Sequence, residues 1–412
     1  MNTTQNKTQY KNSSLGLIPE DWEVKKIGKF TKTTAGGTPS THKLEYWNGD
    51  IKWMSSGDLN LKRIYDVEGR ITDIGLKNSS TKIIPQKCIL IGLAGQGKTR
   101  GTVAMNMVEL CTNQSVAAIF PSKEFYEDYL YYNLDFRYSE LRQLSTGDGG
   151  RGGLNLNIIN SIPVLLPSLP EQTAIAHCLS TWDKAIVAQT QLIAQKELRK
   201  KALMQQLLSG KKRLKGFEKK WEVKLLSDLL IYTPREIDKP LTPFLALGLR
   251  SHGKGVFHKN NFDPKAIAMD KLYVVKENDL VINITFAWEQ AVAIASKIDE
   301  GGLVSHRFPT YTFNLKNAVF LYFKFFILGT KFKSMLDLIS PGGAGRNRVM
   351  SKKDFLKLEI KIPSIEEQTA IANILKCADA EIQLLKKKLQ QLQDQKKGLM
   401  QVLLTGKKRL EY

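Results

Sequence analysis

The stretch ILIGLAGQGKTRG, residues 89–101, contains the spacing G-x-x-x-x-G-K-T between Gly92 and Thr99. Many nucleotide-hydrolysing enzymes use this pattern to surround phosphates, at the start of a helix whose backbone N–H groups hold them. Here the next residues, RGTV, combine glycine with β-branched side chains, which favour a turn and a strand over a helix. We therefore interpret the stretch as a glycine-rich hairpin. Four of its side chains are suited to phosphates of another kind: Gln96, Lys98, Thr99 and Arg100.

Other residue patterns that could perform catalysis are incomplete. The triplets at Glu23, Glu222 and Glu359 have the E-x-K spacing of a metal-dependent nuclease, but no upstream Asp is recognisable that could share the cation. The five histidines lack metal-ligand spacing, and the four cysteines form no C-x-x-C pair. No serine-hydrolase, zinc-protease or amino-methyltransferase signature is present. From the sequence we expect no catalytic residue, metal site or cofactor site in this chain.

The charge of the chain indicates its partner. The 412 residues include 61 Lys and Arg against 40 Asp and Glu, a net charge of +21. Such an excess favours a polyanion such as nucleic acid. The longest apolar run, AVFLYFKFFIL, is too short to span a bilayer. The widely spaced cysteines are typical of reduced thiols, so we expect a cytoplasmic protein, and its length predicts at least two domains.

The chain contains an internal duplication. Residues 167–214 and 363–410 share 24 identical residues in 48 aligned positions without a gap, from PSLPEQTAIA and PSIEEQTAIA to LMQQLLSGKKRL and LMQVLLTGKKRL. Each copy predicts one long helix, with an S-x-x-E capping box at Ser168 or Ser364 and a glycine cap at Gly210 or Gly406. About 40 residues at roughly 1.5 Å each give a helix of about 60 Å.

Both predicted helices carry the apolar pattern of a coiled coil. Apolar residues recur in a 3–4 alternation, which the second copy interrupts only at Lys396. The first copy places Gln189, Lys196 and Lys200 on the same seam. We expect the two helices to pair with each other in an antiparallel direction, which generates an approximate two-fold axis.

A block of different sequence precedes each helix, although WEVKKIGKF at Trp22 and WEVKLLSDL at Trp221 mark the same point in both halves. Short β-branched runs bounded by Gly, Asn and Asp predict mixed, β-rich domains. The expected fold class is α+β, with two β-rich mixed domains separated by two long antiparallel coiled-coil helices. The expected order is a disordered tail (1–15), a domain (16–166), a helix (167–214), a domain (215–362) and a helix (363–412).

These motifs resemble the specificity subunits of type I restriction–modification systems. Almost the whole chain takes part, above all IPEDWEVKKIGKF, TAGGTPSTHKLEYWNGDIKWMSSGDL and the repeated P-x-x-E-Q-x-x-I-A helix. The resemblance implies that each β-rich domain is a target-recognition domain for one half of a bipartite DNA site. It also implies that the helices set the spacing and dock two methyltransferase subunits. The second domain lacks G-G-T-P and W-x-x-x-x-D-L after Trp221, which weakens the transfer of single residues there.

The same resemblance implies the partners and their cofactors. The expected partners are double-stranded DNA, two methyltransferase subunits and restriction or translocase subunits, without a membrane. S-adenosylmethionine, ATP and Mg are expected on the partner subunits, and this chain is expected to be non-catalytic. Polar residues of the two helices are the candidates for docking partners: Glu171, Gln172, Asp183, Glu367, Gln368 and Asp379.

Polar and basic residues of glycine-rich loops are the candidates for DNA contact, because the backbone can approach the duplex closely there. In the first domain they are Gly37, Thr38, Ser40, Thr41, Gln96, Lys98, Arg100 and Arg151. In the second they are Arg250, His252, Lys254, Trp288, Gln290, His306, Arg307, Arg346 and Arg348.

Three points stay open at the level of sequence. The segment 196–220 carries ten Lys and Arg against two Asp and Glu, and it is either a solvated helix face or a contact for phosphate or a partner subunit. A coiled-coil scaffold that does not read DNA is one alternative function. A P-loop nucleotide hydrolase is the other.

Overall fold

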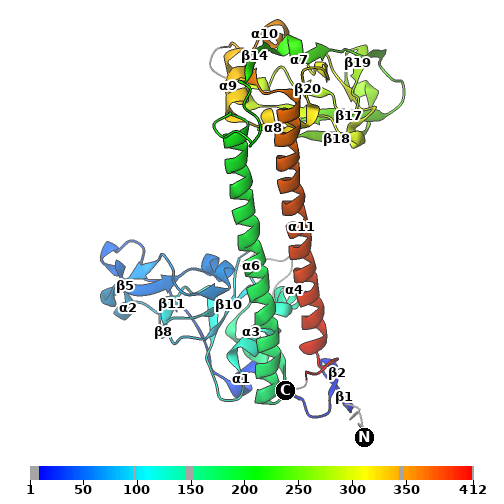
Figure 1. The fold of residues 1–412 in the computed structure, drawn as a ribbon. Helices are drawn as coiled ribbons and strands as arrows, with labels where there is room; N and C mark the ends of the chain where they lie inside the picture. The colour runs from blue at the N-terminus through cyan, green and yellow to red at the C-terminus, as the bar shows by residue number, and fades with distance from the viewer. Residues whose placement is uncertain (1–8, 96–98, 145–152, 343–347, 411–412) are drawn as a thin grey trace. The chain divides into compact units, whose positions relative to one another are not determined.

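The computed structural model describes residues 9–95, 99–144, 153–342 and 348–410. The chain divides into two compact units, unit 1 (residues 1–189 and 388–412) and unit 2 (residues 190–387). Each unit combines one β-rich domain with segments of both long helices, α6 (Leu169–Leu207) and α11 (Ile365–Leu403) (Figure 1). The units therefore differ from a linear series of domain, helix, domain and helix, because each helix belongs to both.

Two main sheets form the β-rich domain in the described part of unit 1. The first has the order β4 (Thr33–Ala35), β12 (Val116–Ile119), β9 (Ile89–Gly92), β10 (Val103–Asn106) and β6 (Arg63–Ile64). The second has the order β7 (Arg70–Ile71), β5 (Trp47–Met54), β11 (Leu110–Thr112) and β8 (Ile83–Ile84). A separate strand pair, β3 (Glu23–Lys26) with β13 (Pro163–Leu166), brings the two ends of the domain together.

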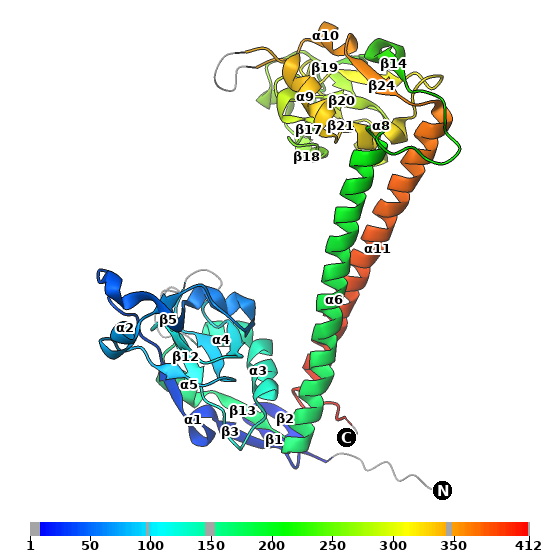
Figure 2. The ribbon, with the colours of Figure 1, turned by 60° about the vertical axis from the view of Figure 1, so that its left-hand side comes forward.

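Short helices connect these strands. They are α1 (Ile27–Phe30), η1 (Leu44–Tyr46), η2 (Ser56–Leu61), α2 (Asp73–Lys77), α3 (Glu127–Phe136), α4 (Tyr138–Gln143) and α5 (Leu156–Ser161). In Figure 2, α3 lies between the strands of the domain and α6. Its buried face, which includes Tyr129 and Tyr132, packs in the same core as the first sheet.

Unit 2 repeats this plan. Its first sheet has the order β15 (Leu230–Tyr232), β23 (Thr310–Phe313), β20 (Leu280–Ile282) and β21 (Val292–Ile294), which matches β4-β12-β9-β10 strand for strand. Its second sheet has the order β16 (Glu236–Asp238), β19 (Lys271–Val274), β22 (Leu303–Val304), β17 (Phe244–Leu249) and β18 (Val256–Phe262). Strands β14 (Glu222–Leu225) and β24 (Glu359–Ile362) pair as β3 and β13 do.

Four short helices of unit 2 stand at the points of the chain that α1, α3, α4 and α5 occupy in unit 1. They are α7 (Leu226–Leu229), α8 (Phe320–Phe326), α9 (Thr330–Leu338) and α10 (Lys352–Leu356). The 3-10 helices stand elsewhere: η4 (Pro264–Ala266), η5 (Ala287–Glu289) and η6 (Lys297–Asp299). The duplication therefore includes the domains, where the two sequences differ almost everywhere.

The hydrophobic cores extend from the domains into the helices. In unit 1 the core includes Leu179 near the start of α6 and Leu403 at the end of α11. In unit 2 it includes Leu375 near the start of α11 and Leu207 at the end of α6. The offset of the sequence repeat relates Leu179 to Leu375 and Leu207 to Leu403, so the predicted duplication holds for packing as well.

The ends of the long helices agree with their predicted caps. The Oγ of Ser168 accepts a hydrogen bond from the backbone N–H of Glu171 at 3.4 Å, and Ser364 caps α11 in the same way. Each helix is followed by a glycine with a φ of 71°, Gly210 and Gly406, as the αL cap requires.

The prediction of a disordered tail over residues 1–15 is wrong from Tyr10 onward. Residues 1–8 lie outside the described residues, but β1 (Tyr10–Ser13) pairs in antiparallel direction with β2 (Gly16–Pro19). The hydroxyl of Tyr10 donates a hydrogen bond to the carbonyl oxygen of Gly406 at 3.2 Å. This partner lies 396 residues further along the chain, so no local sequence window could show it.

Candidate nucleic-acid interface

Three loops of unit 1 meet at one edge of the first sheet. Segment 36–41 follows β4, loop 93–102 joins β9 to β10, and loop 113–115 joins β11 to β12. The backbone N–H of Gly37 donates to the carbonyl of Thr112 at 2.8 Å. The N–H of Leu93 donates to the carbonyl of Ser115, also at 2.8 Å. The fold thus brings together two of the segments in which DNA contacts are predicted. We call these three loops the unit 1 loop cluster.

Two tryptophans hold segment 36–41 in place. Trp53 Nε1 donates to the carbonyl of Gly37 at 3.0 Å, and Trp47 Nε1 donates to that of Ser40 at 3.1 Å. The two indoles pack edge to face with centroids 5.0 Å apart. A Cβ on Gly37 would collide with Ser80 and its neighbouring backbone, so this glycine is needed for a close approach within the domain.

The side chains of segment 36–41 differ in their surroundings. Thr38 donates a hydrogen bond to the amide oxygen of Gln114 in loop 113–115. Ser40 and Thr41 are exposed. These two hydroxyls are therefore the members of the segment best placed to meet a ligand, while Gly37 and Thr38 fix the loop.

The loop that resembles a P-loop lies between two strands. Strand β9 ends at Gly92 and β10 begins at Val103, and the two strands pair antiparallel. The N–H of Gly101 donates to the carbonyl of Gly92 at 2.9 Å. A strand therefore stands where a phosphate-binding loop would need the start of a helix. The predicted hairpin is confirmed, and the P-loop alternative is wrong for this stretch.

The side chains of this hairpin are described only in part. Arg100 is largely buried, with 9% of its surface exposed, so its guanidinium is less accessible than the sequence suggested. Gln96 and Lys98 lie outside the described residues, as does Arg151 of the first domain.

In unit 2, three loops and one segment form a corresponding cluster, which we call the unit 2 loop cluster. It consists of the β17–β18 hairpin tip (250–255), the β20–β21 loop (283–291), loop 305–309 before β23, and segment 348–352, which leads into the first residue of α10. Backbone hydrogen bonds join the first two: His252 N–H donates to the carbonyl of Glu289 at 2.7 Å. The N–H of Ile284 donates to the carbonyl of Arg307 at 3.0 Å, and the N–H of Met350 donates to that of Ile284 at 2.8 Å.

Two of the predicted DNA-contacting residues of unit 2 have structural partners. The side-chain amide of Gln290 is buried and donates to the carbonyl of Ile327 at 2.7 Å. The guanidinium of Arg348 lies 5.2 Å from the ring centroid of Trp288 and forms an ion pair with Asp337 at 2.7 Å. These contacts support the loops, so they explain both residues without DNA. A DNA contact by either stays an untested prediction.

The exposed basic side chains of the cluster are the better candidates. Five predicted residues are exposed: Arg250, His252, Lys254, His306 and Arg307. Arg346 lies outside the described residues. The structure adds the exposed Lys259 and the half-buried Lys352, which the sequence analysis missed because neither stands in a glycine-rich loop. Lys259 lies on β18, 5.9 Å from the ring centroid of Phe257, and Arg250 lies 5.6 Å from the same ring.

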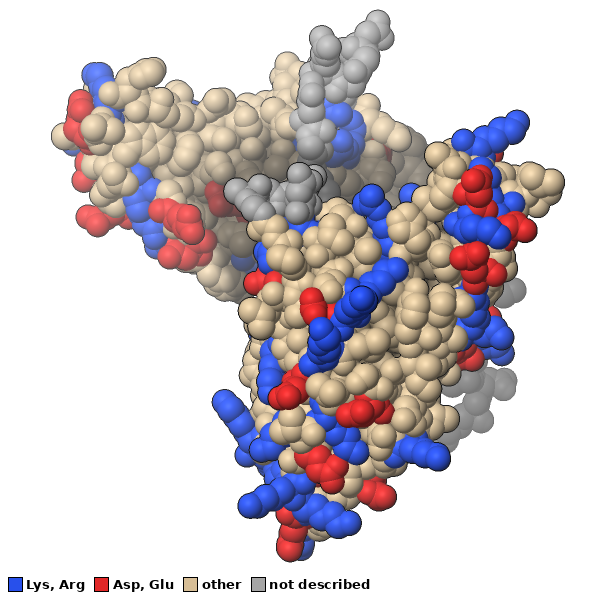
Figure 3. All heavy atoms as spheres, turned by 90° about the horizontal axis from the view of Figure 1, so that it is seen from above, with Lys and Arg blue, Asp and Glu red and all other residues tan. Residues whose placement is uncertain are grey.

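Basic groups are spread over the surface. On the face of unit 2 that Figure 3 shows, blue Lys and Arg side chains are interspersed with red acidic ones. Within segment 196–220, Arg199 and Lys201 are exposed on α6, and Lys211 and Lys212 are exposed after the helix ends. The net charge of +21 is thus distributed over many positions, which suits contacts with a long backbone of phosphates.

The glutamates and glutamines predicted to dock partners are buried at the starts of the helices. Glu171 accepts hydrogen bonds from Trp22 Nε1 at 3.1 Å and from two nitrogens of Arg409 at 2.8 and 2.7 Å. The side-chain amide oxygen of Gln172 accepts from the backbone N–H of Tyr126 at 2.8 Å. The hydrogen bonds with Glu171 raise the pKa of the Arg409 guanidinium above its ordinary value.

The second copy makes the same contacts at the start of α11. Glu367 accepts from Trp221 Nε1 at 3.1 Å and from two nitrogens of Arg213, both at 2.7 Å. The amide oxygen of Gln368 accepts from the N–H of Val319 at 2.9 Å. The predicted capping boxes are therefore only half formed: serine caps each helix, but the glutamate binds tryptophan and arginine.

Two aspartates bind lysines of the opposite helix. Asp183 of α6 pairs with Lys396 of α11 at 2.6 Å in unit 1. Asp379 of α11 pairs with Lys200 of α6 in unit 2. These pairs confirm an antiparallel arrangement of the helix segments within each unit. They also explain the lysines on the apolar seam, as does the ion pair of Lys196 with Glu381. Partner docking by these six polar residues stays a prediction, since contacts within the chain already engage them.

The described residues contain neither a candidate metal site nor a candidate membrane-spanning helix. Among them, no group of three or more His, Cys, Asp and Glu side chains is placed to hold a metal ion. None of the described helices is both long and apolar enough to cross a bilayer.

Comparison with known proteins assigns the duplicated plan to a family. The family described as "Type I restriction modification DNA specificity domain" matches the chain twice, over residues 19–197 and 218–394. The type I restriction enzyme MjaVIII specificity subunit of Methanocaldococcus jannaschii is 25% identical over 96% of this chain and 94% of its own length. The MjaIX specificity subunit of the same organism is 35% identical, but over only 43% of this chain and 42% of its own length.

Solved structures share the fold at low sequence identity. The S subunit of a type I restriction–modification system from M. genitalium covers 98% of both chains, with 14% identity and a TM-score of 0.53. A chain from a structure of type I R-M complex assembly and conformational transition aligns with 13% identity and a TM-score of 0.61, covering 94% of this chain and 99% of that one. Because the family matches both repeated halves, this chain belongs to the type I restriction–modification DNA specificity subunits.

Proposed function

We propose that this chain reads DNA for a type I restriction–modification complex, with each β-rich domain recognising one half of a bipartite target. The observation that carries the proposal is the pair of loop clusters at equivalent strand ends of two duplicated domains. Each cluster joins loops from separate strands and presents exposed polar or basic side chains. Side chains from several loops are what base readout and phosphate contact require.

The proposal assigns methylation and cleavage to other subunits. Methyltransferase subunits supply S-adenosylmethionine, and restriction subunits supply ATP and Mg²⁺. This chain contributes the choice of sequence. The antiparallel glycine-rich hairpin, which stands where a nucleotide-binding loop would need a helix, supports that division.

The helices are proposed to set the spacing of the two half-sites and to dock two methyltransferase subunits. Their ion pairs and caps are repeated in the two units, as the pairs Asp183–Lys396 and Asp379–Lys200 show. Repeated contacts favour two equivalent docking positions, one for each copy of the sequence repeat. The exposed basic residues around 199–212 are candidates for that docking or for contact with the phosphates of the spacer.

The test is to map methylated adenines in cells that express this chain together with its methyltransferase subunit. We expect one motif made of two defined half-sites separated by a spacer of fixed length and undefined sequence. Methylation without sequence preference, or at a single undivided motif, would show that the domains do not divide recognition between them. Complete absence of methylation with an assembled complex would favour the scaffold alternative.

A further inference from the structure

Unit 2 contains a small notch beside its loop cluster. Seven residues line it: Tyr232, Pro234, Tyr273, His306, Phe308, Pro309 and Thr310. Tyr232 ends β15, Pro234 follows two residues later, and Tyr273 lies on β19. The other four residues come from loop 305–309 and the first position of β23. The notch holds about 180 Å³ of empty space, part of it open to solvent. Because part of this space is open solvent, the notch suits a single group presented from outside better than a whole small molecule.

The position of the notch connects it with the candidate interface. Strands β15 and β23 correspond to β4 and β12 of unit 1, so the notch occupies the edge at which segment 36–41 meets loop 113–115 in the first domain. The hydroxyl of Thr310 fixes this edge by donating to the carbonyl of Thr233 at 2.7 Å. Any duplex read by the unit 2 loop cluster would therefore pass next to the notch.

Positive charge lies directly at its rim. The ammonium of Lys352 is 5.9 Å from the ring centroid of Tyr232 and donates to the carbonyl of His306 at 3.1 Å. Arg307, the next residue, is exposed. A ligand that fills the notch is thus expected to carry an apolar group close to anionic groups, as a nucleotide of DNA does.

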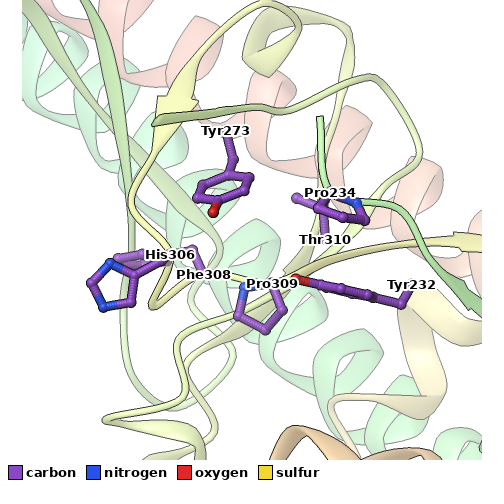
Figure 4. Close-up of a pocket in the computed structure, with 7 residues that line it drawn as sticks. All are labelled: Tyr232, Pro234, Tyr273, His306, Phe308, Pro309 and Thr310. Atoms are coloured by element: carbon purple, nitrogen blue, oxygen red, sulfur yellow. The ribbon is translucent and has the colours of Figure 1, made fainter. Parts of the chain in front are cut away.

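The lining combines apolar walls with two hydroxyls. Figure 4 shows the phenol oxygens of Tyr232 and Tyr273 directed toward the middle of the notch, with the rings of Pro234 and Pro309 around it. The hydroxyl of Tyr273 donates to Glu236 at 3.1 Å, whereas Tyr232 is 44% exposed. The site therefore offers a hydroxyl donor next to a space for an apolar group.

One base has that combination on its major-groove edge. Thymine presents the acceptor O4 beside its C5 methyl group, whereas cytosine presents an amino donor and no methyl, and guanine presents two acceptors without an apolar group. We propose that the notch reads a thymine of the half-site recognised by the second domain. The methyl group enters the notch and O4 accepts a hydrogen bond from the hydroxyl of Tyr232. This inference rests on the proposed DNA-reading function.

The first experiment removes only the methyl group from the DNA. The complete complex of this chain with its methyltransferase subunits is titrated with target duplexes in which single thymines of the second half-site are replaced by deoxyuridine. Loss of one buried methyl group corresponds to roughly a fourfold weaker affinity. We expect that loss at one position of the second half-site. Equal affinity for thymine and deoxyuridine at every position of that half-site would overturn the inference.

The second experiment removes the wall of the notch from the protein. Tyr232→Ala is expected to reduce the thymine-to-deoxyuridine affinity ratio at that position from about four to near one. Ile231→Ala is the matched control, because Ile231 is the neighbouring residue on β15, is 54% exposed and does not line the notch. The control should keep the ratio. A ratio that is unchanged in Tyr232→Ala would contradict the assignment.

A third variant separates the ring from the hydroxyl. Tyr232→Phe should keep the effect of the methyl group but bind the thymine target more weakly, since O4 loses its donor. Full affinity in Tyr232→Phe would show that the hydroxyl does not contact the base. In all variants, selective binding of the target over an unrelated duplex must persist. Its absence already in the unmodified chain would instead contradict the proposed function.

Discussion

At the scale of single residues, a buried glutamate at the start of each long helix binds residues from other segments of its unit. Glu171 is completely buried and Glu367 is 2% exposed, yet each is satisfied by one tryptophan N–H and one bidentate arginine. A buried carboxylate that loses its cation is left partly unpaired, which costs much more than the loss of a surface ion pair.

We predict that Arg409→Ala destabilises unit 1 by about 1–3 kcal/mol, because Glu171 keeps only its bond from Trp22. Arg213→Ala should have the same effect on unit 2 through Glu367. The matched controls are Lys408→Ala and Lys212→Ala, whose side chains are exposed. Thermal unfolding and amide hydrogen exchange at the starts of α6 and α11 measure the effect. Equal protection in the arginine variants and their controls would contradict this role.

Burial is expected to make Cys88 and Cys111 less reactive than the exposed Cys377. Burial raises the pKa of Cys88 to about 12 and, despite a hydrogen bond with Thr81, that of Cys111 to about 11. Both thiols therefore stay protonated at neutral pH, and only the thiolate is a good nucleophile. Cys377 on α11 is exposed.

In the folded protein at pH 8, a thiol reagent such as 5,5′-dithiobis(2-nitrobenzoate) should label Cys377 rapidly. Cys88 and Cys111 should react only after unfolding in denaturant. Mass spectrometry of the labelled peptides identifies the sites. Rapid labelling of either buried cysteine without denaturant would show that the strands around them open easily.

At this scale the sequence predicted residue types better than residue roles. It located Ser40, Arg250 and His306 in loops that the fold does bring to candidate edges. It could not show that the amide of Gln290 binds the carbonyl of Ile327 within the domain, nor that Tyr232 lines a notch beside the unit 2 loop cluster. The reason is that a side chain's direction and partners depend on contacts between distant segments.

At the scale of elements, α3 joins the first domain to α6 by a tyrosine hydrogen bond for which α8 of the second domain has a phenylalanine. Tyr132 of α3 donates to Asp183 of α6 at 2.7 Å, and Lys396 of α11 binds the same carboxylate and lies 5.1 Å from the tyrosine ring centroid. In unit 2, Phe325 of α8 lies against Lys200 at 5.6 Å, and a phenylalanine has no hydroxyl to offer Asp379.

We predict that Tyr132→Phe, which copies the arrangement of unit 2, destabilises the contact between α3 and α6 by about 0.5–1.5 kcal/mol. Hydrogen exchange of α3 and of the first half of α6 should become faster, while unit 2 stays unchanged. Tyr138→Phe, on the neighbouring helix α4, is the control for loss of a tyrosine hydroxyl. Unchanged exchange in Tyr132→Phe would show that the hydrogen bond to Asp183 adds nothing to the attachment of the domain.

The elements themselves were largely accessible to sequence analysis. The 3–4 apolar alternation, the serine caps and the glycines predicted α6 and α11 closely, because local residue types decide where a helix begins and ends. The sequence placed Lys196, Lys200 and Lys396 on the apolar seam, but their partners Glu381, Asp379 and Asp183 lie on the opposite helix. These ion pairs depend on the register of the two antiparallel helices, which the sequence of one helix does not show.

At the scale of the whole molecule, the proposed function links helix length to the distance between half-sites. Four residues inserted after Gln195 and four after Gln391, at matching positions of the two copies, add about 6 Å to each helix. This is close to two base pairs at roughly 3.4 Å each. A four-residue insertion shifts the heptad phase, which coiled coils absorb by local unwinding.

We predict that the spacer of the methylated motif then grows by one or two base pairs, while both half-sites keep their sequences. A control with four residues inserted in the exposed stretch 215–220, outside α6, should leave the spacer unchanged. An active complex with lengthened helices and an unaltered spacer would show that the helices do not set the distance.

The central claim is that each half of the chain reads its own half-site, and methylation mapping of a hybrid tests it most directly. Strands β14 and β24 pair with each other, so residues 226–358 between them begin and end at adjacent points and can be exchanged for those of a family member with known half-sites. Adenine methylation is then mapped in cells that express the hybrid with its methyltransferase subunit. We predict a motif that keeps the original first half-site and takes its second from the donor. A hybrid that changes both half-sites, or neither, would contradict the division of recognition between the two domains.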